Sequence, residues 1–290
     1  MAFAKRIIDV QFQLGQGDFG EAGMNTVDLK GLRCSAQIEK SGIYGQAVLD
    51  LRIWGMSLSM MNQLTVLNRF NFAEQRPNSV VVMAGDEISG TSVVFGGTIL
   101  EAWADGRDPP DIVFHLTAVS ALYETLKAVP PISYRGSVDA ALVISGIATQ
   151  MGYQFQNYGV TAQIDNPYYP SSLRAQLEAV CEEAYCNFDP DGAKRILSIW
   201  PKDQSQGGQA IKISRETGMV GYPSFTQMGV QVVTLYNPSI AFGVPVQIES
   251  QFTTAAGQWV PIAVAHSLES EVPGGQWFTS FEAQTLGHAA

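Results

Sequence analysis

The chain carries few side chains whose types and spacing could do chemistry. Its histidines, His115, His266 and His288, are far apart, and none has a Cys, His or Asp partner at the spacing of a metal site. Cys181 and Cys186 lie five residues apart on a predicted helix, which fits neither a zinc knuckle nor a disulfide framework. We therefore expect no metal and no cofactor.

The acidic residues also lack the pattern of an active site. Glu182 and Glu183 are adjacent on a predicted helix and diverge by about 100°, so they cannot flank one glycosidic bond. The run from Asp189 to Gly192 lacks the later acidic ligands of a calcium loop and predicts a plain turn. No nucleophile elbow, phosphate loop or zinc-protease motif occurs, and the glycine-rich segment 14–25 is not followed by a helix. The sequence predicts a protein that is not an enzyme.

Composition points to a folded protein with much uncharged surface. Of 290 residues, 46% are hydrophobic and only 15% are charged, against roughly 25% in typical soluble domains. Uncharged surface is common where a protein meets copies of itself or partners. The balance of 17 basic and 27 acidic residues, a net charge of −10, argues against a stable grip on nucleic acid. The odd cysteine count of three favours a reducing compartment.

The first 120 residues predict a β-rich domain, a small sandwich or barrel. Hydrophobic residues alternate with polar ones over 8–14, 32–38 and 47–53, and further strands are expected over 79–83, 92–103 and 111–119. A short helix is expected over 57–67, with Ser57 or Ser59 as its N-cap. Such alternation means one covered face per strand.

Residues 121–205 predict an inserted α/β domain, in which Pro130 and Pro131 mark the change from strand patterns to helix patterns. The first helix is expected from Ser137 as N-cap to Gly152 as stop, with an apolar stripe formed by Ala141, Leu142, Ala148 and Met151. A second helix is expected after Ser172, with Leu173, Leu177, Val180, Cys181 and Ala184 facing inward. A hairpin follows, with its turn at Pro190–Gly192.

Residues 206–290 predict a second β-rich domain, with strands over 229–236, 244–248, 260–264 and 277–283 and a turn at Pro238 and Ser239. After Arg215 there is no Lys or Arg, and Thr217 to Ile248 contains no charged residue or histidine. Prolines and glycines break this stretch too often for a membrane helix. Because apolar residues occupy both faces of the strand 229–236, we expect both faces to be covered, by another sheet or by another subunit. The candidate residues for a subunit interface are Val230, Gln231, Val232, Val233, Leu235, Trp54 and Met56.

Three blocks of the sequence resemble the baseplate hub proteins of tailed bacteriophages, which are related to the hub half of type VI secretion spikes. The first is GLRCSAQIEKSGIYGQAVLDLRIWGMSLSMMNQL, the second runs from SVDAALVISGIATQMGY to the hairpin ending in Trp200-Pro201, and the third is TGMVGYPSFTQMGVQVVTLYNPSIAFGVPVQI. The resemblance implies an α+β, β-rich fold with two related β-barrel or sandwich tube domains and an inserted α/β domain. No self-similarity between residues 1–120 and 206–290 is visible in the sequence, so the duplication is implied by the family.

The resemblance also implies a function. Three subunits with two tube domains each would make a homotrimeric, pseudo-sixfold ring that joins a hexameric tail tube to a trimeric spike and lets DNA pass. The expected partners are further copies of the chain, the tail tube protein and the spike protein, with baseplate wedge and tape-measure proteins as further candidates. The expected location is the tail baseplate of a virion that is assembled in the host cytoplasm.

Two alternatives remain open at the level of sequence. The chain could be a carbohydrate- or peptidoglycan-binding protein, or a hydrolase, in which tryptophans stack on sugar rings; its tryptophans are Trp54, Trp103, Trp200, Trp259 and Trp277. It could instead be another ring-forming tail tube protein, which would not need the inserted domain. The mass in solution separates a ring from a monomeric lectin or hydrolase.

Overall fold

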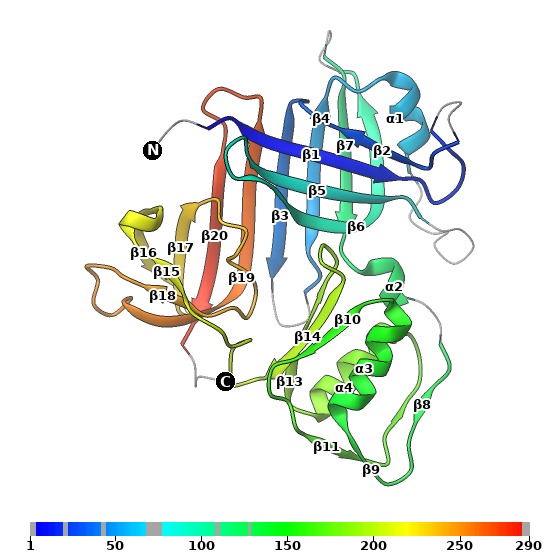
Figure 1. Ribbon diagram of the computed structural model, residues 1–290, viewed down its shortest axis with the longest axis vertical. Coiled ribbons are helices and arrows are strands. Elements are labelled where there is room, and N and C mark those ends of the chain that lie inside the picture. The colour runs from blue at the N-terminus through cyan, green and yellow to red at the C-terminus, as the bar shows by residue number, and fades with distance from the viewer. Residues whose placement is uncertain are drawn as a thin grey trace.

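The computed structural model describes residues 4–19, 23–41, 45–67, 77–107, 111–126 and 129–285. His288 and part of the glycine-rich segment 14–25 lie outside these residues. The fold is α+β and rich in strands, as expected (Figure 1). One sheet of 13 strands runs through the N-terminal and C-terminal parts of the chain, and the inserted part between them holds three smaller sheets.

The N-terminal unit contains seven strands and the helix α1 (Leu58–Leu64). The strands are β1 (Arg6–Gln13), β2 (Thr26–Leu29), β3 (Cys34–Ser41), β4 (Val48–Trp54), β5 (Ser79–Asp86), β6 (Gly90–Asp105) and β7 (Val113–Val119). β1 and β5 cross over β3, β4 and β7, so that the sheet folds onto itself in two layers (Figure 1). Phe12 of β1 meets Phe114 of β7 edge to face between these layers, with 6.4 Å between the ring centroids.

The alternation in the sequence is the cause of these strands. Cys34, Ala36 and Ile38 of β3 are buried while the intervening residues are not, and β4 repeats the pattern. Ser57 caps α1 by accepting a hydrogen bond from the Met60 amide, as predicted. The helix ends at Leu64, earlier than expected.

The inserted unit packs two helices, α3 (Ala140–Met151) and α4 (Leu173–Glu183), against a three-stranded sheet. That sheet consists of β10 (Gln154–Asn157), β13 (Cys186–Asp191) and β14 (Ile196–Pro201). The short elements are α2 (Leu122–Leu126), β8 (Ile132–Ser133), β9 (Ser137–Asp139), β11 (Gln163–Asp165) and β12 (Tyr168–Tyr169).

Two details of the inserted unit differ from the prediction. Asp139, not Ser137, caps α3: residues 137–139 form β9, which pairs with β11, so the helix starts only after Asp139, whose side chain accepts a hydrogen bond from the Ala141 amide. Leu142 is 60% exposed, and the buried stripe of α3 is formed by Val143, Ile144 and Ile147 together with the alanines and Met151. Gly152 ends the helix at a positive φ of 75°, as predicted.

The second helix of this unit agrees with the prediction, whereas the hairpin after it is displaced. Ser172 caps α4, and Leu173, Leu177, Val180 and Cys181 are buried. The turn of the hairpin covers 192–195, because Pro190 and Asp191 still pair within the β13–β14 ladder.

The C-terminal unit has β15 (Ile211–Ile213), β16 (Met219–Phe225), β17 (Val230–Leu235), β18 (Val246–Ile248), β19 (Gly257–Ser270) and β20 (Trp277–Gln284). Ser214 caps a 3-10 turn, η2 (Arg215–Thr217), through a capping box with Thr217. The expected turn at Pro238 and Ser239 is present. The strand expected over 260–264 is much longer, because β19 pairs along its length with three other strands, β18, β20 and β3.

Buried hydrophobic residues form three clusters, one centred in each unit. The first also contains Leu268 and Trp277 from the C-terminal unit, so the two β-rich units share part of a core. The division of the chain into domains at residues 120 and 205 remains a prediction.

Candidate functional site

The two β-rich units repeat one strand order. In the N-terminal unit the neighbours run β3-β4-β7-β6, and in the C-terminal unit they run β16-β17-β20-β19. In each series the first two strands, which are consecutive in the chain, pair with each other. The second then pairs with the final strand of the unit, β7 or β20, and that strand pairs with the long strand just before it in the chain, β6 or β19. In each unit this long strand also pairs, through its first part, with a strand of the second layer: β6 with β5 and β19 with β18.

A β-bulge occurs at the same place in both units, which fixes the alignment between them. The pairing of β6 with β7 shifts between Ile99 and Glu101, and the pairing of β19 with β20 shifts between Pro261 and Ala263. With the bulges superposed, the ladders on the far side also agree, and Trp54 at the end of β4 corresponds to Leu235 at the end of β17. The expected duplication is therefore present in the strand pairing.

The two units are joined within the chain by pairing between β19 and β3. Eight residue pairs run from Ala263 opposite Ser41 to Ser270 opposite Cys34. On one face, Ser267 Oγ donates a hydrogen bond to Gln37 Oε1 at 2.7 Å. The sheet therefore continues from one unit into the other with no gap.

His266 lies on the covered face of this joint. It is 8% exposed, its Nδ1 lies 2.9 Å from Thr279 Oγ1, and its ring meets the Tyr236 ring edge on. Burial lowers the pKa of His266 from 6.5 to about 4, so the imidazole is neutral at pH 7. A neutral, buried histidine of this kind serves packing and hydrogen bonding.

The joined sheet has an edge at each end. Among the described strands, β16 pairs on one side only, with β17. The second half of β6 pairs with β7 on one side, and on the other a single bridge joins Ala102 to Val66, which follows α1. Strand edges of this kind are sites at which another chain can pair.

Exposed apolar side chains gather along and beside the β16 edge. Tyr222 is 58% exposed and Phe225 is 59% exposed, whereas a strand at this position would normally carry charges to discourage pairing. Tyr222 packs on Phe252, with ring centroids 5.1 Å apart, and donates a hydrogen bond to Gln251 Oε1 at 3.2 Å. The other exposed apolar residues here are Val220, Met228, Val233 and Leu235.

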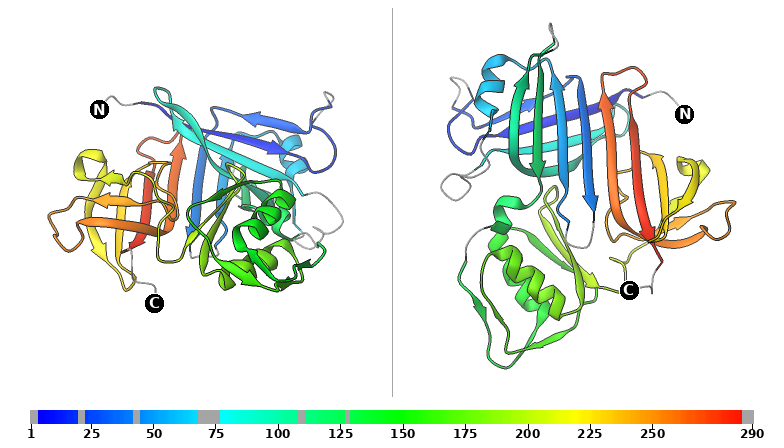
Figure 2. Two further views of the ribbon diagram at one scale, coloured as in Figure 1. Left: turned by 60° about the horizontal axis from the view of Figure 1, so that its bottom comes forward. Right: turned by 180° about the vertical axis from the view of Figure 1, so that it is seen from behind.

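One face of the joined sheet is open along its length, as the view from behind shows (Figure 2, right). The strand registers place six acidic residues and one arginine on this face: Glu39, Asp50, Glu101, Asp105, Glu269, Glu282 and Arg52. A second arginine, Arg33, lies over the Trp54 ring at the end of β4 on the same face. Thr117 Oγ1 donates a hydrogen bond to Asp50 at 3.0 Å, and the Trp103 and His115 rings stack 5.4 Å apart. The open face is therefore acidic.

The hairpin of β13 and β14 fixes the inserted unit at the place where the two β-rich units meet (Figure 1). Gly192 at its turn touches Gly96 of β6 so closely that a Cβ on Gly96 would lie 2.8 Å from the Gly192 carbonyl oxygen. On the other side, Trp200 of β14 packs against Phe242, with centroids 5.4 Å apart. A Cβ on Gly243 would lie 2.5 Å from the Trp200 ring.

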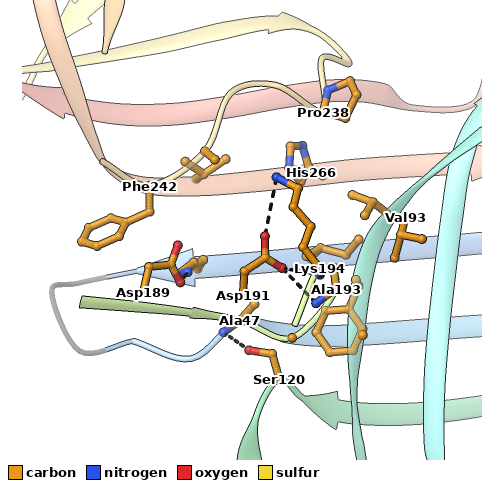
Figure 3. A pocket seen from close by; sticks show the side chains of 18 of the residues that line it. Ala47, Val93, Ser120, Asp189, Asp191, Ala193, Lys194, Pro238, Phe242 and His266 are labelled. Atoms are coloured by element: carbon orange, nitrogen blue, oxygen red, sulfur yellow. Dashed lines mark hydrogen bonds and ion pairs between the residues drawn. The ribbon is translucent and has the colours of Figure 1, made fainter. Parts of the chain in front are cut away.

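Charged groups at this junction are satisfied by one another. Lys40 of β3 forms an ion pair with Asp189 of β13, and their side chains are only 16% and 10% exposed. Asp191 Oδ1 accepts hydrogen bonds from the Ala193 and Lys194 amides at 2.9 and 3.0 Å (Figure 3). The cavity between these groups and His266 holds about 100 Å³. With both carboxylates engaged, the junction has the features of a structural joint.

No metal or membrane site appears among the residues that the structure describes. No three His, Cys, Asp or Glu side chains come together there in a group that could hold a metal ion. In the same part of the chain, no helix is both long enough and apolar enough to span a bilayer.

Comparison with known proteins decides the family. The family model described as baseplate hub gp41 matches residues 7–273. The chain belongs to this baseplate hub family. It is thus a structural protein of the phage tail baseplate and a component of the virion tail. A search of curated proteins gave no match.

Solved structures of two tail proteins and of a type VI secretion component share the fold of this hub. The tail protein of Neisseria meningitidis MC58 has a TM-score of 0.61 at 9% identity, covering 97% of both chains. The 43 kDa tail protein of prophage MuSo2 from Shewanella oneidensis has a TM-score of 0.60 at 8% identity, covering 97% of this chain and 96% of that one. The E. coli c3393 protein, a component of the type VI secretion system, has a TM-score of 0.55 at 7% identity, covering 88% of this chain and 74% of that one.

The structure divides the predicted interface residues of the hub into two groups. Val230 and Val232 are 0% and 1% exposed and belong to the core of the C-terminal unit. Met56 is buried in the core of the N-terminal unit. Because these three side chains are buried inside the single chain, they could influence an interface only by positioning the strands or turns that carry it.

The remaining predicted residues reach the surface. Gln231, Val233 and Leu235 lie on the open face, one strand in from the β16 edge. The Arg33 guanidinium lies over the Trp54 ring, with its carbon 4.3 Å from the centroid of that ring. A contact between copies at these four residues remains a prediction. The sequence did not identify the β16 edge itself, although Tyr222 and Phe225 beside Gly221 and Pro223 were visible as apolar residues next to strand breakers.

The tryptophans do not form a sugar-binding platform. Trp200, Trp259 and Trp277 are between 1% and 9% exposed. Trp54 and Trp103 contact Arg33 and His115, respectively. The carbohydrate alternative therefore loses most of the aromatic surface on which it depended.

Proposed function

We propose that this hub chain assembles into a homotrimeric ring that joins the hexameric tail tube to the trimeric spike and lets DNA pass. The observation that carries the proposal is the repeated strand order, with the two units already joined through β19 and β3. Each chain thus supplies two equivalent parts in one continuous sheet. Three chains would supply six, which matches a sixfold partner on one side and a threefold partner on the other.

The open acidic face supports the passage of DNA. A ring that curves around this face would present Glu39, Asp50, Glu269 and the other carboxylates to the lumen, where they outnumber Arg33 and Arg52. Phosphates would be repelled, so DNA would not be retained.

The inserted unit would lie on the outside of such a ring. Its hairpin contacts the face of the sheet opposite the open one, where Gly192 meets Gly96. There it would be available to further baseplate components, with wedge and tape-measure proteins as candidates. Assembly would take place in the host cytoplasm, where the three buried cysteines Cys34, Cys181 and Cys186 stay reduced.

Electron microscopy of the chain mixed with the tail tube and spike proteins of its own virus tests this proposal. The expected class averages show a ring with threefold symmetry and six similar lobes around a central channel. Particles of a single chain bound to a partner, without a ring, would overturn the proposal.

A further inference from the structure

We infer that β6 of one copy pairs with β16 of the next copy, with residues 103–105 opposite residues 224–226 in antiparallel register. The inference rests on the proposed ring and states which edges close it and in what register. The edges, β6 and β16, are the counterparts of β19 and β3, which already pair within the chain.

The register follows from the alignment of the two units. When the two bulges are superposed, Ala104 of β6 is equivalent to His266 of β19. In the same alignment, the pairing of β16 with β17 and of β3 with β4 makes Phe225 equivalent to Ile38. Because His266 lies opposite Ile38 inside the chain, Ala104 should lie opposite Phe225 between chains.

The exposure of the residues at the β6 and β16 edges indicates that each edge lacks a neighbouring strand in the single chain. In the internal joint, Ile38 is 4% exposed and His266 is 8% exposed. Their counterparts differ: Phe225 is 59% exposed, and Ala104 is exposed as well. A phenylalanine at a position that the neighbouring strand covers in the other unit is expected to be covered in the same way.

Val66 sets the limit of the contact. Its amide donates to the Ala102 carbonyl oxygen at 2.8 Å, and the Ala102 amide donates back at 3.0 Å, so this part of the β6 edge is taken. An incoming β16 must therefore end opposite residue 103. It does so, because β16 ends at Phe225 and the turn that follows is closed by the Thr226 amide donating to the Gly229 carbonyl oxygen at 2.9 Å. In this register the incoming strand does not overlap the bridge between Val66 and Ala102.

The contact is heterologous, because it joins different edges of two copies. Repeated around a threefold axis it closes a ring, whereas pairing of β16 with a second β16 would give a twofold dimer. Engineered cysteines distinguish these arrangements. The paired positions Asp105 and Ser224 correspond to Ser267 and Gln37 of the internal joint, whose side chains already touch.

The test uses the full chain together with the tube and spike proteins, with oxidised glutathione as the oxidant. The variant with Asp105→Cys and Ser224→Cys should give disulfide-linked dimers and trimers on a non-reducing gel. A mixture of the two single variants should give dimers only, and each single variant alone should give none. The native cysteines are buried and add little background.

Two further variants act as controls. Ser267→Cys with Gln37→Cys should form a disulfide within one chain, which shows that the geometry of such a pair suits the bond. Asp105→Cys with Val220→Cys, out of register, should link far less than the matched pair. Phe225→Asp should lower the fraction of chain in rings by at least about tenfold.

The outcomes separate the two proposals. Cross-linking by Ser224→Cys alone would show pairing of like edges and overturn the inference. Rings that form normally while the matched pair stays unlinked would overturn the register and leave the ring standing. A chain that stays monomeric with both partners present would overturn the ring and, with it, the pairing.

Discussion

Gly192 touches Gly96 at the point where the inserted unit meets the N-terminal sheet, and neither position leaves room for a Cβ. Neither residue has a positive φ, so contact between the backbones, rather than backbone strain, is the reason for glycine at both. This contact and the Trp200 packing on Gly243 hold the hairpin between the two β-rich units.

Replacing Gly192 by Ala should therefore destabilise the chain by about 1 to 3 kcal/mol, because the new methyl group meets the Gly96 carbonyl and the Ser120 side chain. Urea unfolding measures the change. Gly146→Ala is the matched control, since Gly146 lies on the exposed side of α3 with nothing within 4 Å, and it should be neutral or stabilising. Equal effects of both substitutions would contradict the tight contact.

The ion pair of Lys40 and Asp189 should matter more than any exposed pair. Lys40→Met keeps the apolar stem but leaves the nearly buried Asp189 carboxylate without its partner, at a cost of about 3 kcal/mol in the free energy of unfolding. Lys212→Met is the control, because Lys212 and Glu249 are 50% and 52% exposed, and an exposed ion pair of this kind contributes little to the free energy of unfolding. If Lys40→Met costs no more than the control, the pair does not hold the junction.

Stability should fall with acid partly through His266. Its pKa is about 4 in the folded chain and about 6.5 when unfolded, so the unfolded chain takes up a proton first as the pH falls. The contribution of neutral His266 to the free energy of unfolding is complete above pH 6.5 and is lost progressively down to pH 4.

Between pH 7 and 4.5 the native chain should thus lose about 2 to 3 kcal/mol more than the variant His266→Gln, which cannot titrate. Urea unfolding of both chains at the two pH values measures the difference. Parallel losses in the two chains would show that His266 is not the titrating group.

The sequence was sufficient to predict the features that depend on residues close together along the chain, namely the covered faces of strands and the helix caps. Alternation identified the covered faces of β3 and β4, and side-chain oxygens identified the cap Ser172 and narrowed the other cap to Ser57 or Ser59, of which Ser57 is the one used. It was wrong about Ser137 because β11 pairs with that residue across a long separation, and local signals do not report such pairing.

The joint of β19 with β3 could not be predicted for the same reason. Its partners are more than 200 residues apart, and the duplication that it reveals is retained in bulges and register rather than in residue identity. The strand β17 shows the limit of the hydrophobic pattern: Val233 and Leu235 suggested a second covered face, but they are 36% and 38% exposed in the single chain.

Charge on the open face should decide whether DNA is retained. Glu39→Lys combined with Asp50→Lys should make the assembled ring bind double-stranded DNA at low salt, with affinity that falls steeply as salt rises. The control combines Glu182→Lys with Asp203→Lys, which makes the same charge change on exposed residues of the inserted unit. Equal DNA binding by the two variants, measured by fluorescence anisotropy, would show that the open face does not line the channel.

The mass of the native chain in solution, measured with the tail tube and spike proteins present, tests the central claim most directly. The hub of 31.4 kDa should contribute three copies to each complex, so that its share of the mass is three times that of one chain. A complex that holds one copy of the chain, or two, would contradict the ring.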